Sequence, residues 1–183
     1  MKKAVFIDPG HGGIDPGCPL GEGEKEYNVR IANCLASMLQ ARGYKVEQSR
    51  RNDLSVSLKQ RCQMANAFYQ ANGGIFVSIH HNASTSTHAE GMEVFYCRGS
   101  RVGYVLANNM ITGMQTYLYE NSMVNRGVKE GSFYVLQHTK APAVLVECEF
   151  LTGPKLAEIK NCPSAWVHHM AKVLLRGIEL TLR

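Results

Sequence analysis

The fold is decided by a short stretch near the amino terminus, AVFIDPGHGG (residues 4–13). An apolar run over residues 3–7 is stopped at once by Asp8-Pro9-Gly10, and Pro and Gly cannot continue the ladder of a β-sheet. This pattern is typical of a buried strand that runs into a turn. Because ligands of open α/β sheets gather at the carboxyl ends of the strands, the polar residues of this turn are candidates for a functional site.

The rest of the chain alternates between helical and strand-like segments. Apolar residues at helical spacing predict helices over residues 24–42, 57–71 and 102–119, and positions between Trp166 and Ile178 predict a last amphipathic helix. Short apolar runs predict strands over residues 44–48, 75–79, 92–96 and 143–146. We therefore predict an α/β fold in one domain over residues 1–183, with a largely parallel, mixed and twisted sheet and helices on both faces.

The composition is that of an ordinary globular chain. The 183 residues are 45% hydrophobic and 19% charged, which excludes a disordered, collagen-like or disulfide-stapled chain. The net charge of +5 is spread along the sequence and forms no concentrated basic tail. We expect no nucleic-acid partner. The charge is equally compatible with an anionic polymer and with a neutral partner.

The cysteines and the apolar stretches bear on where the chain is made. No two of the six cysteines form a Cys-x-x-Cys pair, so we expect free thiols, which are typical of a reducing cytoplasm. Only four apolar residues follow Met1-Lys2-Lys3, too few for a signal peptide, and no stretch approaches the roughly 20 apolar residues of a membrane span. We expect synthesis in the cytoplasm without a visible signal peptide, and no membrane anchor.

Polar residues that can bind a metal follow three of the predicted strands. His11 follows the first strand, His80 the third and Glu147 the last, and Glu24 opens the first helix beside the same sheet edge. Two imidazoles and two carboxylates match the needs of catalytic zinc, which takes three protein ligands, an open position for water and a nearby carboxylate as general base.

Each of these residues has a plainer interpretation. A glycine-rich loop after a first strand also suggests dinucleotide binding, but that motif needs Gly where this chain has Asp15. His80 and His81 can be loop histidines that backbone groups satisfy, and Glu147 can be the first solvated residue after a strand or a desolvated base with a raised pKa. We interpret the remaining histidines, His88, His138, His168 and His169, as surface or structural residues.

Four motifs resemble, in order, those of the zinc-dependent N-acetylmuramoyl-L-alanine amidases of the amidase type 3 family. They are IDPGHGG with DPG (residues 7–17), EKEYNV (24–29), VSIHHNA (77–83) and PAVLVE (142–147). The resemblance implies that His11, Glu24 and His80 bind one zinc ion and that Glu147 is the catalytic carboxylate. Glu22 and Glu26 are the alternatives to Glu24.

The sequence departs from the family pattern after Glu147. Cys148 and Glu149 replace a small residue and Gly, and Gly153 replaces a common Asn. These departures predict a changed shape of the substrate groove. His81 also replaces a small residue, and we expect it to flank the site rather than bind substrate.

The resemblance implies hydrolysis of the amide between N-acetylmuramic acid and L-alanine in peptidoglycan, with peptidoglycan as the partner. The alternatives are a zinc peptidase that cuts within the stem peptide and a non-catalytic peptidoglycan-binding module. With no visible signal peptide, the chain resembles a phage or prophage endolysin that reaches the wall after release, and the alternative is a catalytic fragment of an exported enzyme. The sequence carries no signal of an oligomeric state.

Overall fold

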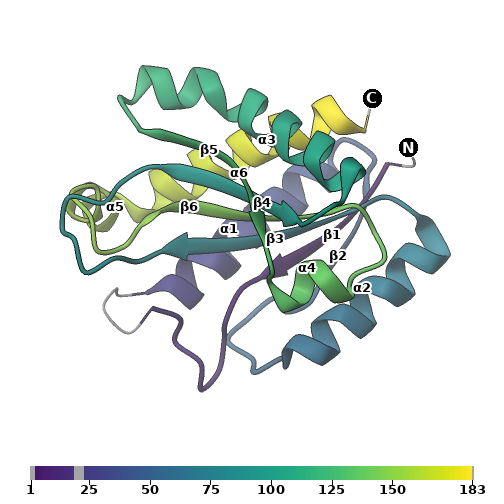
Figure 1. The fold of residues 1–183 in the computed structure, drawn as a ribbon. Coiled ribbons are helices and arrows are strands. Elements are labelled where there is room, and N and C mark those ends of the chain that lie inside the picture. Colours follow the sequence, from purple (N-terminus) through teal and green to yellow (C-terminus); the bar gives the residue numbers. More distant parts are fainter. Residues whose placement is uncertain (1–2, 19–22, 183) are drawn as a thin grey trace.

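The computed structural model describes residues 3–18 and 23–182 and forms an open sheet with helices on both sides (Figure 1). The strands are β1 (Ala4–Pro9), β2 (Lys45–Gln48), β3 (Ile75–Asn82), β4 (Met92–Cys97), β5 (Asn125–Gly131) and β6 (Ala143–Phe150). The helices are α1 (Glu24–Gln40), α2 (Leu58–Asn72), α3 (Arg101–Glu120), α4 (Tyr134–His138), α5 (Leu156–Asn161) and α6 (Pro163–Thr181).

The six strands lie in the order β2-β1-β3-β6-β4-β5. The first four of these are parallel to one another, β4 runs antiparallel to β6, and β5 is parallel to β4. The sheet is therefore mixed and largely parallel, as predicted. Because β1, β3 and β6 are neighbours and parallel, their carboxyl ends meet at one edge of the sheet.

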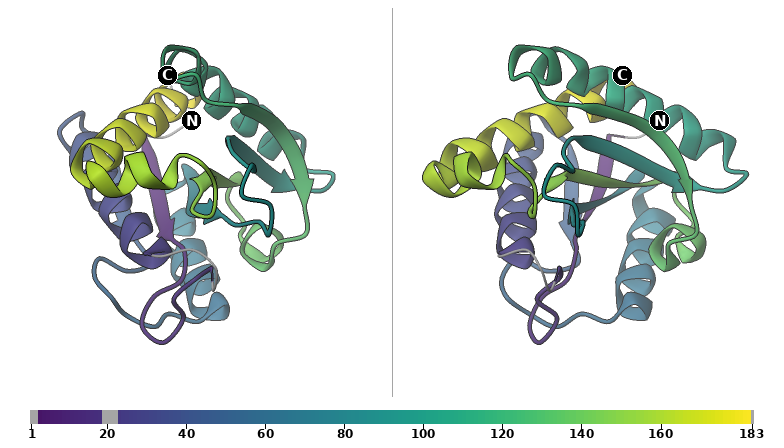
Figure 2. Two further views of the ribbon diagram at one scale, coloured as in Figure 1. Left: turned by 90° about the vertical axis from the view of Figure 1, so that its left-hand side faces the viewer. Right: turned by 60° about the vertical axis from the view of Figure 1, so that its left-hand side comes forward.

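The two faces of the sheet are covered unequally (Figure 2). Alternate strand residues such as Val5, Val77 and Val146 belong to the larger hydrophobic cluster, which also contains the buried side chains of α1, α3 and α6. The residues between them, such as Phe6 and Phe76, belong to a smaller cluster with α2 and α4. The predicted coverage of both faces is confirmed. The lighter cover of α2 and α4 leaves that face accessible near the carboxyl ends of the strands.

Several segments differ from the sequence prediction. The polar edge strand β5 and the short helices α4 and α5 were not predicted, because none of them has a long apolar period. β3 and β6 extend beyond their apolar runs, so His80 and Glu147 lie within strands and not after their ends, which corrects the prediction. The added polar residues stay in the sheet because the two strands continue to pair, with His80 opposite Glu147.

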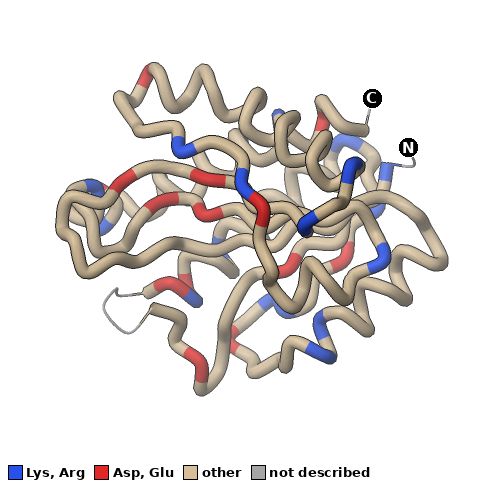
Figure 3. Tube along the Cα trace, in the orientation of Figure 1, with Lys and Arg blue, Asp and Glu red and all other residues tan. Residues whose placement is uncertain are grey.

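The structure also bears on the expectations about cysteines, charge and membrane spans. All six cysteines lie in the described residues and none of them forms a disulfide, as predicted. Lys and Arg are distributed along the trace, interspersed with Asp and Glu (Figure 3). Within residues 3–18 and 23–182, no helix combines the length and apolar character needed to cross a membrane.

The contact between α3 and α6 depends on glycine. A Cβ atom at Gly113 of α3 would lie 2.4 Å from the backbone nitrogen of Gly177 on α6. We expect Gly113→Val to lower the free energy of unfolding by about 1–3 kcal/mol, because the two helices must separate to admit the side chain. Urea unfolding of this variant measures the loss. Gln115→Val puts the same residue at an exposed position of α3, and an equal loss there would contradict the packing argument.

Candidate metal centre and active site

His11 lies in the turn that follows β1, and its backbone has a φ of 61°, a left-handed conformation that few residues other than Gly adopt. Two buried arginines hold this turn. Arg50 Nη2 donates to the carbonyl of Gly10 at 2.7 Å, and Arg61 Nη2 donates to the carbonyl of His11 at 2.6 Å. Gly10 is required for close approach, since a Cβ atom there would lie 2.2 Å from the ring of His80.

Arg61 is itself fixed by a buried ion pair. Its Nη1 lies 2.7 Å from Oδ1 of Asp8, and both side chains are almost completely buried. Asp8 also accepts hydrogen bonds from Ser49 Oγ at 2.6 Å and from Ser78 Oγ at 2.9 Å. The carboxylate thus joins β1, β3, α2 and the segment after β2 directly beneath the turn that carries His11.

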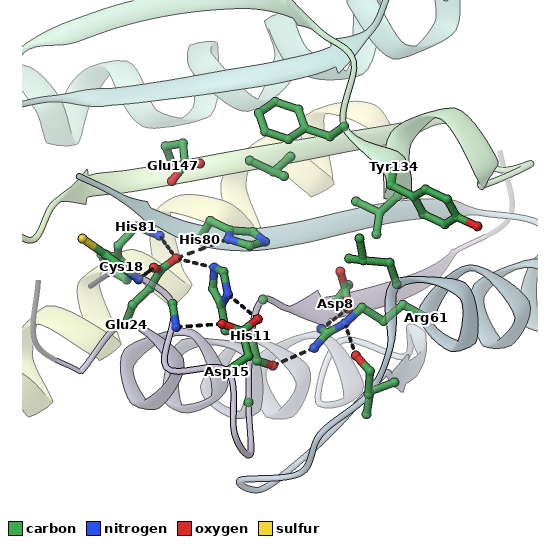
Figure 4. Close-up of a pocket in the computed structure, with 18 of the residues that line it drawn as sticks. Asp8, His11, Asp15, Cys18, Glu24, Arg61, His80, His81, Tyr134 and Glu147 are labelled. Carbon is green, nitrogen blue, oxygen red and sulfur yellow. Dashed lines mark hydrogen bonds and ion pairs between the residues drawn. The ribbon is translucent and has the colours of Figure 1, made fainter. Parts of the chain in front are cut away.

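Glu24 is the first residue of α1 and brings the two histidines together. Its Oε1 lies 3.1 Å from Nε2 of His11 and 3.2 Å from Nδ1 of His80, and its Oε2 accepts from the backbone N–H of Cys18. One possible ligand atom from each of His11, Glu24 and His80 lies within 4.8 Å of the others (Figure 4). The structure thus brings together the three residues predicted as metal ligands.

Of the two alternative glutamates, the structure describes Glu26, which does not join this cluster. Glu26 is exposed, and its carboxylate lies 3.8 Å from Nζ of Lys25. Glu22 lies outside the described residues.

The electrostatics of the cluster favour a cation. Burial opposes the ionisation of Glu24, but hydrogen bonds from His11 and His80 outweigh it and hold the pKa of Glu24 well below its ordinary value. Burial likewise disfavours the protonated imidazole of His11, but Glu24 and Asp15 outweigh it and raise the pKa of His11 to about 9. Two imidazole nitrogens and one ionised carboxylate form a ligand set that fits a zinc ion with one position left open.

Glu147 lies on β6 beside His80 of β3, and Figure 4 shows it across the pocket from Glu24. On its other side it is paired with Glu93 of β4. Burial raises the pKa of Glu147 to about 7, and Glu24 and Glu93 add to the shift. Its Oε2 is buried with no hydrogen-bond partner among the described residues, so the carboxyl has a free oxygen at the site.

His81 belongs to a buried hydrogen-bond chain behind the cluster. The indole Nε1 of Trp166 donates to His81 Nε2 at 3.2 Å, and His81 Nδ1 lies 2.8 Å from Oδ1 of Asn28. An indole N–H can only donate, so His81 must accept at Nε2 and donate at Nδ1 to Asn28. Burial lowers the pKa of His81 to about 4, which agrees with this neutral form.

The chain of hydrogen bonds continues to a predicted ligand. Because Oδ1 of Asn28 accepts from His81, the amide Nδ2 must point the other way. It lies 3.5 Å from Oε1 of Glu24 and 3.4 Å from the carbonyl of Gly10. His81 therefore flanks the cluster, as expected. The involvement of Trp166 was missed because Trp166 is 85 positions from His81 and looks like an ordinary core residue in its helix.

The three residues after Glu147 that depart from the family pattern do not line the described pocket, whereas His81 does. Cys148 is buried in the larger cluster, and Glu149 Oε1 accepts from the backbone N–H groups of Gly91 and Phe150. A Cβ atom at Gly153 would lie 2.0 Å from the carbonyl oxygen of Ala89. These positions serve the packing of loops and the core, and none of the three is among the described lining residues. Their effect on the shape of the substrate groove stays a prediction.

Trp166→Phe removes the indole N–H and keeps an aromatic ring, so it tests whether the chain of hydrogen bonds orients Glu24. We expect zinc affinity to fall about tenfold, in the range usual for residues that orient a metal ligand. Competition with a chelating dye measures it. Val173→Ala removes a buried side chain from the same helix without touching the chain of bonds. An equal fall in that control would assign the effect to general loss of stability.

Comparison with known proteins relates this chain to a family. A family model described as N-acetylmuramoyl-L-alanine amidase (Amidase_3) matches residues 5–179. N-acetylmuramoyl-L-alanine amidase LytC of Bacillus subtilis (strain 168) is 39% identical over 158 residues, which are 84% of this chain and 30% of LytC. The probable cell wall amidase LytH of Staphylococcus epidermidis is 32% identical over 156 residues, 83% of this chain and 49% of LytH.

A solved structure of similar fold is also an amidase of this kind. N-acetylmuramoyl-L-alanine amidase AmiC2 of Nostoc punctiforme is similar with a TM-score of 0.86 at 31% identity, over 96% of this chain and 94% of that one. The chain spans between 30% and 49% of the length of the two curated relatives. The match over residues 5–179 shows that the chain belongs to the amidase type 3 family of N-acetylmuramoyl-L-alanine amidases, the family indicated by its four motifs.

Proposed function

We propose that this chain is a zinc-dependent amidase that hydrolyses the bond between N-acetylmuramic acid and L-alanine in peptidoglycan. The observation that carries the proposal is the juxtaposition of two groups in one pocket, the cluster His11, Glu24 and His80 and the buried carboxyl of Glu147. The family supplies the substrate class. We place the activity at the cell wall, where LytH is named a probable amidase. That the chain is a phage or prophage endolysin stays a prediction.

His11, Glu24 and His80 would hold one zinc ion. When bound, zinc polarises a carbonyl oxygen and lowers the pKa of a water molecule to about 7. Asp15 Oδ2 lies 2.8 Å from Nδ1 of His11 and so fixes Nε2 as the nitrogen that faces Glu24. The backbone N–H of Cys18 occupies Oε2 of Glu24 and leaves Oε1 directed at both histidines.

Glu147 would move the proton. A carboxylate at this position accepts a proton from the attacking water, and the resulting carboxylic acid donates it to the nitrogen of the departing peptide. Both halves of this exchange are accessible near neutral pH because burial raises the pKa of Glu147 to about 7. The free Oε2 is the oxygen available for the transfer.

Glu147→Gln tests this role. We expect turnover to fall by about 10²–10⁴-fold, the range for loss of a general acid–base group, while zinc stays bound. Release of stem peptides from purified peptidoglycan, followed by mass spectrometry, gives the rate, and elemental analysis gives the metal content. Glu149→Gln is the matched control, since Glu149 is a buried glutamate of the same strand outside the pocket lining. Near-normal lysis by Glu147→Gln would refute the assignment.

Metal removal tests the other half of the site. We expect a chelator to abolish lysis and added zinc to restore it. His11→Ala and His80→Ala should each lose the metal, because only two of the three ligands would remain.

The products decide the reaction. Intact stem peptides with an N-terminal L-alanine support the amidase, whereas fragments cut within the peptide would make the chain a peptidase. Binding to walls without any product, from a zinc-loaded sample, would make it a binding module.

A further inference from the structure

The pocket extends well beyond the metal cluster. Its volume is about 780 Å³, and one group of its lining residues is apolar. We call this group the apolar limb. It consists of Val56 just before α2, Leu58 at the start of α2, Phe133, Tyr134 and Val135 around the start of α4, and Leu145 of β6. Figure 4 shows Tyr134 away from Glu24.

The apolar limb adjoins the position of the reaction. Leu145 and Glu147 are two residues apart on β6, so their side chains point to the same face of the sheet about 7 Å apart. Both line the pocket. A substrate held at the amide beside Glu147 therefore extends into the apolar limb on one side of the scissile bond.

Large apolar side chains of the limb are exposed to solvent. Leu58 is 53% exposed, Tyr134 38% and Phe133 36%. The two rings are held in place: Phe133 packs edge-on against Phe95 with centroids 5.0 Å apart, and Tyr134 stacks on His138 at 3.9 Å. Exposed apolar side chains gathered on a concave wall mark a binding site, and here they are already ordered.

The charge of the pocket selects between the two halves of the substrate. Among the described lining residues, Arg61 is the only Lys or Arg, and its charge is compensated by Asp8. Lys129, whose Nζ lies 5.9 Å from the ring of Phe95, is ion-paired with Glu93. The residues that form the apolar limb include no Lys, Arg or His that could receive a carboxylate, and the rest of the described lining includes acidic residues such as Glu24 and Glu147.

We propose that the apolar limb is the subsite for the glycan side of the substrate, the N-acetylated sugar that carries the lactyl group. This inference rests on the proposed amidase function. The glycan is uncharged, and its ring faces and acetyl methyl group are apolar, whereas the stem peptide carries free carboxylates. A carboxylate in the limb would lose its water without gaining a cation, so the peptide extends in another direction from Glu147.

The test compares two substrates that share the amide and the peptide. One is a muropeptide with its disaccharide, and the other is the lactoyl-peptide from which the sugars have been eliminated. We expect Leu58→Ser and Tyr134→Ala to lower kcat/KM for the muropeptide about tenfold and to leave the lactoyl-peptide nearly unchanged. Tyr134→Phe, which keeps the ring, should retain the wild-type preference.

Leu54→Ser is the matched control, because Leu54 is 54% exposed in the segment before α2 but does not line the pocket. It should change neither substrate. Thermal unfolding of each variant verifies that the fold is kept. Equal losses on both substrates would overturn the glycan subsite, as would an effect that disappears when the stem peptide is shortened to L-alanine, since the limb would then bind peptide.

A binding measurement separates this inference from the proposed function. Calorimetry in the Glu147→Gln background gives the affinity for each uncleaved substrate. If the zinc-loaded wild type cleaves neither substrate, the proposed function fails, yet preferential binding of the muropeptide that Leu58→Ser abolishes still supports the subsite. Equal affinity for the two substrates in this background overturns it.

Discussion

The buried ion pair between Asp8 and Arg61 is the interaction on which the site depends. Two charges taken out of water are tolerated only when hydrogen bonds satisfy their remaining atoms. Here Ser49 and Ser78 complete Asp8, and backbone carbonyls of the His11 turn complete Arg61. The hydrogen bonds that satisfy Arg61 therefore also hold the turn, and loss of either charge would leave the other unpaired beneath His11.

The alternation of side chains along the strands divides the work between the two faces. His80 and His81 are adjacent, yet His80 joins Glu24 in the pocket and His81 bonds Trp166 of α6 on the other side. The densely covered face thus supports Glu24 from behind, through His81 and Asn28. The lightly covered face supplies the space in which a substrate can lie. Because β1, β3 and β6 are parallel neighbours, the supporting hydrogen bonds and the substrate space meet at one edge of the sheet.

The sequence was sufficient for the fold class and for the residues that converge, because both follow from local patterns. Apolar runs located β1, β3 and β6, and the polar residues next to those runs were the ones that the sheet brings together. The sequence was insufficient for features that depend on contacts between distant residues and not on a local pattern of apolar side chains. The polar strand β5 is held by its neighbour β4, and the contact of Arg61 with Asp8 joins residues 53 positions apart. No local period marks either feature.

The same reasoning explains why the pocket ends in an apolar limb. Phe6, Phe76 and Leu145 form the floor of the smaller cluster, which α2 and α4 cover. Towards the carboxyl ends of the strands, Asp8, His80 and Glu147 replace the apolar residues on that face. Asp8 is still covered by Arg61 of α2, and His80 and Glu147 line the pocket. The junction between apolar floor and polar edge necessarily leaves some apolar wall exposed. A substrate with an uncharged group on one side of the bond to be cut is complementary to a pocket whose apolar limb adjoins Glu147.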